Sequence, residues 1–292
     1  MAAAGVEDVA LQRGSVDCQV VWTRATDGAE LRALLTAEER ERYRRLHDPA
    51  DRARFVTGRA LARAVIGHRL DSRPDEVVFT RSCRRCGGPH GKPEVPGSPV
   101  SFSLSHAGGQ VLLALTEGVD VGVDVERTGG RYAERLAAMV LSSAELSSLA
   151  SVVPWRREHA FRVYWTRKEA LLKTVGLGVL SSMRAITVSP ADGRAELVAW
   201  EKRTDVPRFR LADLGAPDGY AAALAAHGGR GVRLLEFRTE HPLDVPPGRG
   251  TSQGRFREAS PRRDGRRSPD PGRGWPAGSG ACSSRVPGPA RS

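Results

Sequence analysis

The chain has 292 residues, of which 40% are hydrophobic and 27% charged, and its formal net charge is +11. This length suffices for one large domain or two small ones with a sizeable core. No apolar run approaches the roughly 18 residues of a membrane helix. The start lacks the basic and apolar regions of a signal peptide, and four cysteines do not make a disulfide framework. These features exclude a membrane-spanning or disulfide-scaffold protein and predict a cytoplasmic one.

The positive charge is spread unevenly along the chain. Residues 241–292 contain 10 Arg and 4 acidic residues, a net charge of +6, which leaves +5 for residues 1–240. This last stretch is dominated by Gly, Pro, Arg, Ser and Ala and has no apolar periodicity, so we expect a disordered tail. The mildly basic body favours an acidic partner or a phosphorylated ligand.

Helical and strand-like patterns alternate before the tail, which predicts a mixed α+β fold. Capping boxes at Thr36 to Glu39 and at Ser142 to Glu145 each open a predicted helix. In chain order, we expect strands over 17–23, 76–80, 100–105, 110–116, 119–126, 184–189, 195–201, 219–226 and 232–238. We expect helices over 37–47, 50–69, 132–138, 143–151 and 155–175.

The two capping boxes also indicate an internal repeat. The stretches "LTAEE" and "LSSAE" lie 106 residues apart, and each is followed by a long helix that leads to a strand. The repeat predicts two similar subdomains, over residues 1–117 and 118–240, with a cleft between them as the natural place for a site.

One predicted strand, "VDVGVDVER", carries an acidic face. Its valines point one way, while Asp120, Gly122, Asp124 and Glu126 point the other. Carboxylates at i and i+2 repel each other, and acidic residues are poor strand formers. The face is either an ordinary solvated one or, with Glu169 from a helix, a set of hard oxygen ligands suited to Mg²⁺.

The predicted helix "YWTRKEALLK" places charged residues beside a buried face. Trp165, Glu169 and Lys173 step by four and share a stripe next to the apolar one, so a carboxylate and an ammonium project together. A simple i,i+4 ion pair is one interpretation of this spacing. Lys168 falls within the apolar stripe, where we expect it to snorkel or to pair structurally.

The stretch "SFSLSHAGG" predicts a hairpin that begins with alternating serines. It places Ser105 and His106 immediately before the glycine turn. Adjacent residues do not form a hydrolase triad, and the chain has no GxSxG motif. The pair is either satisfied locally or donates hydrogen bonds to phosphate oxygens.

Together these stretches resemble the 4′-phosphopantetheinyl transferases. The pattern is "SLSH", then "VGVDVE", then some 40 residues, then "WTRKEALLK"; "HGKP" and "ARFVTGRALAR" resemble the family's upstream motifs. The size and doubled layout are similar to the surfactin-synthetase-activating (Sfp-type) class, over about residues 15–240. The resemblance implies a pseudo-two-fold pair of α/β subdomains, followed here by the disordered tail.

The resemblance also implies a reaction and a set of site residues. Coenzyme A would give its phosphopantetheine arm to a serine of an apo acyl or peptidyl carrier protein, releasing adenosine 3′,5′-bisphosphate. Glu169 would accept the serine proton, Lys173 would contact the pyrophosphate, and the carrier protein would be acidic and the enzyme a monomer. The implied Mg²⁺ ligands are Asp124, Glu126 and Glu169. The implied nucleotide contacts are Arg52, Arg59, Lys92, Ser105 and His106.

Two other classes of protein remain open. Cys83, Cys86 and His90 resemble half of a zinc site, and with the net charge they would fit a zinc-dependent nucleic-acid-binding protein. Most of the charge excess lies in the tail, however, and the acidic strand face argues against this class. A carrier-binding relative without catalysis is the second alternative, and the complete set of acids and lysine argues against it.

Overall fold

The computed structural model describes residues 15–81, 88, 91–177 and 183–245, and within them the chain has an α+β fold. The strands are β1 (Val16–Arg24), β2 (Thr80–Arg81), β3 (Pro93–Glu94), β4 (Val100–Ala107), β5 (Gln110–Glu117), β6 (Asp120–Arg127), β7 (Ile186–Val188), β8 (Leu197–Trp200), β9 (Phe209–Asp213), β10 (Tyr220–His227) and β11 (Val232–Thr239). The α-helices are α1 (Ala29–Ala33), α2 (Ala37–Arg45), α3 (Pro49–Leu70), α4 (Glu134–Val140), α5 (Ser143–Ser151) and α6 (Arg157–Thr174).

Short sequence patterns explain where several of these helices and strands begin. Both predicted capping boxes are confirmed: the Thr36 and Ser142 side chains accept from the backbone N–H groups of Glu39 and Glu145, whose carboxylates accept in return. The expected strand over 76–80 is wrong over most of its length. A 3₁₀ helix at Pro74–Glu76 occupies the beginning of this stretch. It forms because Pro74 fixes the backbone of the first turn and the Glu76 carboxylate accepts from the Arg73 N–H.

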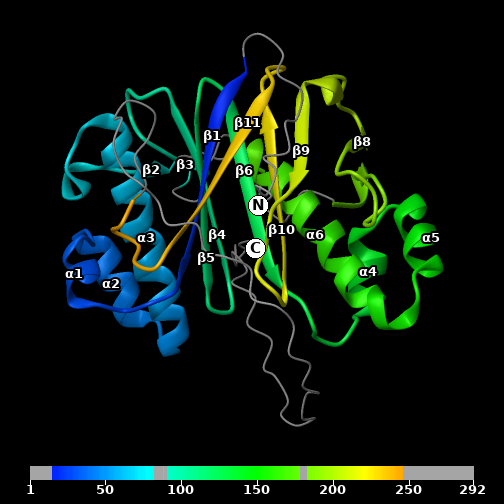
Figure 1. Cartoon of the computed structure of the whole chain (residues 1–292), viewed down its shortest axis with the longest axis horizontal. Coiled ribbons are helices and arrows are strands. Elements are labelled where there is room, and N and C mark those ends of the chain that lie inside the picture. The colour runs from blue at the N-terminus through cyan, green and yellow to red at the C-terminus, as the bar shows by residue number, and fades with distance from the viewer. Residues whose placement is uncertain (1–14, 82–87, 89–90, 178–182, 246–292) are drawn as a thin grey trace, which may run out of the picture. The chain divides into compact units, whose positions relative to one another are not determined.

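The described residues form two larger sheets and two small two-stranded ones, β2-β3 and β7-β8. One has the strand order β11-β1-β5-β4, in which β1 and β11 run parallel and the other pairs antiparallel. The second is antiparallel and has the order β6-β10-β9. Strand β11 follows β10 in the chain but joins the first sheet, so the last strand of the chain crosses back to β1 (Figure 1).

Each sheet has its own long helix, and the two sheets share a core. Helix α3 packs through Leu61, Val65 and Ile66 against one face of the first sheet. Helix α6 packs through Leu171 and Leu172 against the second sheet, and Figure 1 shows the two helices on opposite sides of the strands. The valines of β6 lie in a third cluster with side chains of β1, β5 and β10. The predicted division of strand β6 into a valine face and an acidic face is therefore confirmed.

Serine side chains join the two sheets along β4 and β6. Residues of β6 donate their backbone N–H groups to hydroxyls of β4, and both partners advance together along the chain, so the strands run parallel. The three hydrogen bonds are Val121 N to Ser101 Oγ (3.2 Å), Val123 N to Ser103 Oγ (3.0 Å) and Val125 N to Ser105 Oγ (3.3 Å). This junction, the seam, uses hydroxyls where a regular sheet would use backbone carbonyls. The alternating serines of "SFSLS" therefore have a structural role.

The folded part continues a little beyond the last strand. Leu243 and Val245 pack against apolar clusters of the N-terminal half. The rest of the expected tail lies outside the described residues. The division at residue 117 stays a prediction, and we note that β11 pairs with β1 across it. In the part of the chain that the structure describes, no helix is long and apolar enough to cross a bilayer.

Candidate active site

The acidic face of β6 meets helix α6 at one end of the seam. Asp124 is buried, and its Oδ1 accepts from Lys173 Nζ at 2.6 Å and from Ser105 Oγ at 2.8 Å. Lys173 Nζ also donates to Ser105 Oγ at 3.0 Å and to the Val123 carbonyl at 3.1 Å. The structure thus brings together three of the predicted site residues from β4, β6 and α6.

A glycine permits this close approach of strand and helix. A Cβ atom on Gly122 would lie 2.1 Å from the Ala170 carbonyl oxygen and 2.4 Å from the Thr174 backbone nitrogen. Any side chain here would push α6 away from β6. Gly122 therefore lets Glu169 and Lys173 reach the strand, a role that its place between two acids did not reveal.

Two further carboxylates stand beside Asp124. Burial, followed by the charge of Asp124, raises the pKa of Glu169 to about 7, and Lys173 opposes this shift. Burial and Asp124 likewise raise the pKa of Glu126 to about 7, against the lowering influence of Arg162. Arg162 Nη1 lies 3.7 Å from Glu126 Oε2. The site therefore gathers more negative charge than its neighbouring cations neutralise.

Two carboxylate oxygens at this site are suited to binding a cation. Asp124 Oδ2 and Glu169 Oε1 are buried and have no hydrogen-bond partner among the described residues. A buried carboxylate oxygen without a donor is costly, and a hard divalent cation would satisfy it. No three His, Cys, Asp or Glu side chains of the described ranges are arranged as a ready-made metal site. The donor types fit Mg²⁺, but the ligand geometry is not preformed.

His106 and Arg54 lie near Lys173. His106, at the end of β4, keeps access to solvent, but loss of hydration and then the charges of Arg54 and Lys173 lower its pKa. Arg54 Nη1 donates to the Gly108 carbonyl at 3.0 Å, which fixes the guanidinium beside the β4–β5 turn. Sequence reasoning missed Arg54, although it lies within the noted stretch "ARFVTGRALAR"; the helix register was the missing information.

The two predicted arginine contacts, Arg52 and Arg59, have partners elsewhere. Arg52 donates from Nε to the Leu46 carbonyl at 2.7 Å and lies over the Tyr43 ring. Arg59 pairs with Glu39 at 3.2 Å, and burial together with Arg81 lowers its pKa to about 10. Neither is seen to contact the Asp124 network, and their nucleotide contacts stay predictions.

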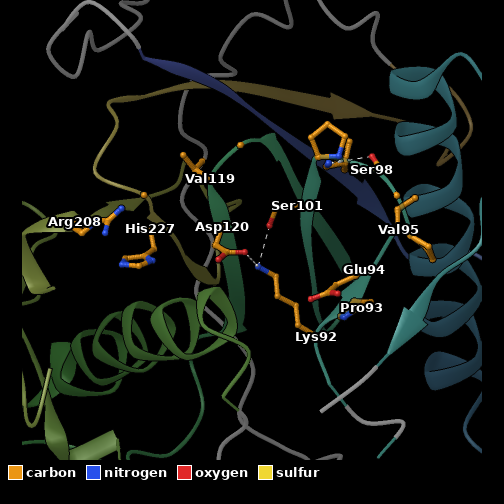
Figure 2. A pocket seen from close by; sticks show the side chains of 16 residues that line it. Lys92, Pro93, Glu94, Val95, Ser98, Ser101, Val119, Asp120, Arg208 and His227 are labelled. Atoms are coloured by element: carbon orange, nitrogen blue, oxygen red, sulfur yellow. Dashed lines mark hydrogen bonds and ion pairs between the residues drawn. The ribbon is translucent and has the colours of Figure 1, made fainter. Parts of the chain in front are cut away.

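Lys92 lies at the opposite end of the seam. Its Nζ donates to Ser101 Oγ, Asp120 Oδ1 and the Thr174 carbonyl. Asp120 precedes Asp124 by four residues, about 13 Å along a strand. A pocket of about 540 Å³ opens beside Lys92 and Asp120, and Arg208 and His227 also line it (Figure 2).

The predictions for Lys168 and for a zinc site remain to be compared with the structure. Lys168 is fully buried and pairs with the buried Glu145, so its expected structural pairing is confirmed. Its Nζ also donates to the Val140 carbonyl at 2.8 Å, so Lys168 ties the end of α4 as well as Glu145 of α5 to the helix that carries Glu169. The proposed zinc ligands Cys83, Cys86 and His90 lie outside the described residues.

Comparisons with known proteins agree with the motifs. Residues 120–225 match the sequence model of the 4′-phosphopantetheinyl transferase superfamily. The chain is 30% identical over 219 residues to slr0495 of Synechocystis sp. (strain ATCC 27184 / PCC 6803 / Kazusa), a provisionally named 4′-phosphopantetheinyl transferase, covering 70% of this chain and 85% of the relative. It is 29% identical over 201 residues to the 4′-phosphopantetheinyl transferase HetI of Nostoc sp. (strain PCC 7120 / SAG 25.82 / UTEX 2576), covering 68% and 81%.

A solved structure is similar over a smaller part. Thermotoga maritima holo-[acyl-carrier-protein] synthase is 25% identical, with a TM-score of 0.31 over 38% of this chain and 64% of that one, an overlap too small to argue from. The sequence matches place the chain among the transferases. It belongs to the 4′-phosphopantetheinyl transferase superfamily. Its place in the Sfp-type class stays a prediction.

Proposed function

We propose that this enzyme transfers the 4′-phosphopantetheine arm of coenzyme A to a serine of an apo carrier protein at the Asp124 end of the seam. The reaction follows from membership of the family, and one observation supports placing it at the Asp124 end. A partly buried network of a lysine, a carboxylate and a hydroxyl lies beside two carboxyls with raised pKa values. Phosphoryl displacement requires positioning and charge neutralisation rather than covalent participation by the protein.

Cations near Asp124 would bind the phosphates of coenzyme A. Lys173 has its ammonium at the junction of β4, β6 and α6, and Ser105 supplies a hydroxyl there. His106 and Arg54 lie close enough to influence each other electrostatically. We propose these four side chains as the phosphate contacts. The nucleotide contacts of Arg52 and Arg59 stay predictions, and the contacts of Lys92 point to a different role for that residue.

Glu169 is our candidate for the general base. Its pKa of about 7 keeps it able to take a proton near neutral pH, and its Oε1 has no donor among the described residues. The carrier serine oxygen would attack the phosphorus that bears the pantetheine arm, and its proton would pass to Glu169. The bond from that phosphorus to adenosine 3′,5′-bisphosphate would break, so the bisphosphate leaves with the electron pair.

Asp124, Glu126 and Glu169 would hold Mg²⁺. When bound, the ion would neutralise charge on the pyrophosphate of coenzyme A. The buried oxygens of Asp124 and Glu169 that find no hydrogen-bond partner within residues 15–81, 88, 91–177 and 183–245 support this assignment. Glu126 is the ligand with the most exposed position and already has Arg162 as a partner.

The carrier protein is expected to be acidic, because residues 1–240 carry a formal net charge of +5. Association steered by charge weakens as ionic strength rises. The KM for a carrier protein should therefore increase with salt, while the KM of a neutralised carrier variant should not. We also expect a monomer, which sedimentation equilibrium would test.

Intact mass spectrometry of an apo carrier protein tests the function directly. Incubation with this enzyme, coenzyme A and Mg²⁺ should add one phosphopantetheine, and a chelator or the Glu169→Ala variant should prevent it. No mass increase on fatty-acid, polyketide or peptide carrier proteins, with the enzyme folded, would contradict the proposal.

A further inference from the structure

The contacts of Lys92 identify an ammonium held by three elements. Its Nζ lies 3.1 Å from Ser101 Oγ on β4, 3.3 Å from Asp120 Oδ1 on β6, and 3.2 Å from the Thr174 carbonyl oxygen at the end of α6. Figure 2 shows the side chain reaching between the strands toward Asp120 and Ser101. An ammonium has three donors, and these three acceptors can engage all of them.

The Thr174 contact completes a helix end. The last four carbonyls of a helix have no partner within it, and a cation near that end is also favoured by the helix dipole. Lys92 supplies both a donor and a positive charge there. Its side chain is only 11% exposed, so this interaction is shielded from solvent more than a surface ion pair would be.

The last turn of α6 carries a proposed phosphate contact. Thr174 directly follows Lys173, whose ammonium must reach Asp124 and Ser105. The Thr174 hydroxyl lies 2.8 Å from the Ala170 carbonyl of its own helix and 3.1 Å from the Ala225 carbonyl on β10, and its single proton is shared between these acceptors. The hydrogen bond from Lys92 to Thr174 and the close backbone approach at Gly122 together limit how far α6 can shift along β6.

We propose that Lys92 is a positioning residue that holds the last turn of α6 so that Lys173 meets the Asp124 carboxylate. This role rests on the transferase function proposed above. It differs from the nucleotide contact expected from the sequence, because Lys92 here acts through Thr174 and not on the substrate. Misplacing a reacting or charge-stabilising group by about 1 Å can lower a rate by roughly a hundredfold, so a distant tether can matter.

The test combines kinetics with ligand binding. Lys92→Met keeps the side-chain length but removes the charge and donors, and Lys202→Met, at an exposed lysine, is the matched control. Lys92→Met should lower kcat by about tenfold or more, the scale expected for loss of hydrogen bonds to a charged group. The KM for coenzyme A and the affinity for adenosine 3′,5′-bisphosphate should stay within about twofold of wild type, since a positioning residue does not touch the nucleotide.

A double-mutant cycle adds a second readout. If Lys92 acts through Lys173, the Lys92→Met change should have little further effect on kcat in a Lys173→Met background. Amide hydrogen exchange should show faster exchange in the last turn of α6 in Lys92→Met and no change in Lys202→Met. This exchange measurement needs no catalytic turnover.

The outcomes of these experiments distinguish the positioning role of Lys92 from the proposed transferase function. A raised KM or weakened bisphosphate binding with an unchanged kcat would make Lys92 a nucleotide contact and overturn the positioning role. Additive effects with Lys173→Met, or unchanged exchange in α6, would overturn it as well. A wild-type enzyme that transfers nothing would contradict the proposed function, while hydrogen exchange would still decide whether Lys92 holds α6.

Discussion

The seam between β4 and β6 has a lysine, a serine and an aspartate at each of its two ends. At one end Lys173 contacts Ser105 and Asp124, and at the other Lys92 contacts Ser101 and Asp120. The Asp124 side chain is 6% exposed, whereas that of Asp120 is 41% exposed. The two aspartates therefore stand in different dielectric surroundings, while the lysines differ in the opposite sense, with side chains 11% exposed at Lys92 and 29% at Lys173.

The ends also differ in their charge balance. Glu126 and Glu169 lie beside Asp124, and each adds negative charge that Lys173 alone does not neutralise. At the other end, Lys92 contacts the Asp120 carboxylate and the end of a helix, so its charge helps to hold the fold. Both ends have a lysine, a serine and an aspartate, so these residue types do not distinguish them. The excess of buried carboxylates distinguishes the Asp124 end as the one suited to metal and phosphate chemistry.

The largest expected effect is at Glu169. Glu169→Gln keeps the shape but removes the proton acceptor, so the rate of transfer should fall between about 10²- and 10⁴-fold. Initial rates from intact mass spectra of the carrier protein would measure it. The Glu201→Gln change, at an exposed carboxylate, is the matched control and should leave the rate unchanged. Retained activity in Glu169→Gln would remove this residue from the mechanism.

The next effect concerns the helix that serves both ends. Gly122→Ala would place a methyl group against the backbone of α6, so we expect a loss of about 3 kcal/mol in the free energy of unfolding. Urea denaturation would measure it. Gly109→Ala is the control, since a Cβ there meets nothing within 4 Å. Equal stability of the two variants would mean that α6 and β6 are not in backbone contact.

The middle of the seam provides a third prediction. Ser103→Ala would leave the buried N–H of Val123 without its acceptor, at a cost of about 1–3 kcal/mol. The exposed Ser147→Ala change, inside α5, should be neutral or slightly stabilising. Denaturant titrations of both variants would show whether the hydroxyls join the two sheets. A neutral Ser103→Ala would argue that they do not.

A fourth expected effect is a dependence of stability on pH. Glu126 and Glu169 have pKa values raised from 4.5 to about 7, so the folded state keeps protons that the unfolded state has released. The free energy of unfolding should therefore fall as pH rises from about 4.5 to 7. The Glu169→Gln variant should show a shallower fall in thermal melts without metal. An identical slope in this variant would contradict the raised pKa.

Magnesium should oppose this loss of stability. A cation that binds the ionised carboxylates of the folded state stabilises that state by mass action. Mg²⁺ should therefore raise Tm above pH 7 in the wild type and much less in Glu169→Gln. The same shift in both proteins would place the ion elsewhere.

Local patterns predicted much of the fold because their physical causes are local. Strict alternation defined β6 and its two faces, and the capping boxes set the starts of α2 and α5. The seam was harder to predict, since serines in a strand give no sign that they will accept from a neighbouring strand. The short strand β9 was missed because "FRLAD" has too few residues for a clear period.

The candidate site was predicted in part for the same reason. The spacing of Glu169 and Lys173 puts both on one helix stripe, and the strand period puts Asp124 and Glu126 on one face. Arg54 was missed because the arginines of α3 look alike in sequence, and only the packing of the helix decides which one lies near His106. The partners of Lys92 come from three distant segments, which no local pattern specifies.

The comparison of the two ends is tested most directly by a matched pair of variants, Asp124→Asn and Asp120→Asn. Initial rates of carrier modification would be measured for both at saturating coenzyme A and Mg²⁺. Asp124→Asn should lower the rate by about a hundredfold or more, because it removes a charge that stabilises the site. Asp120→Asn should lower it by no more than about tenfold, since the amide oxygen can still accept from Lys92. Equal losses, or a greater loss at Asp120, would contradict the assignment of the reaction to the Asp124 end.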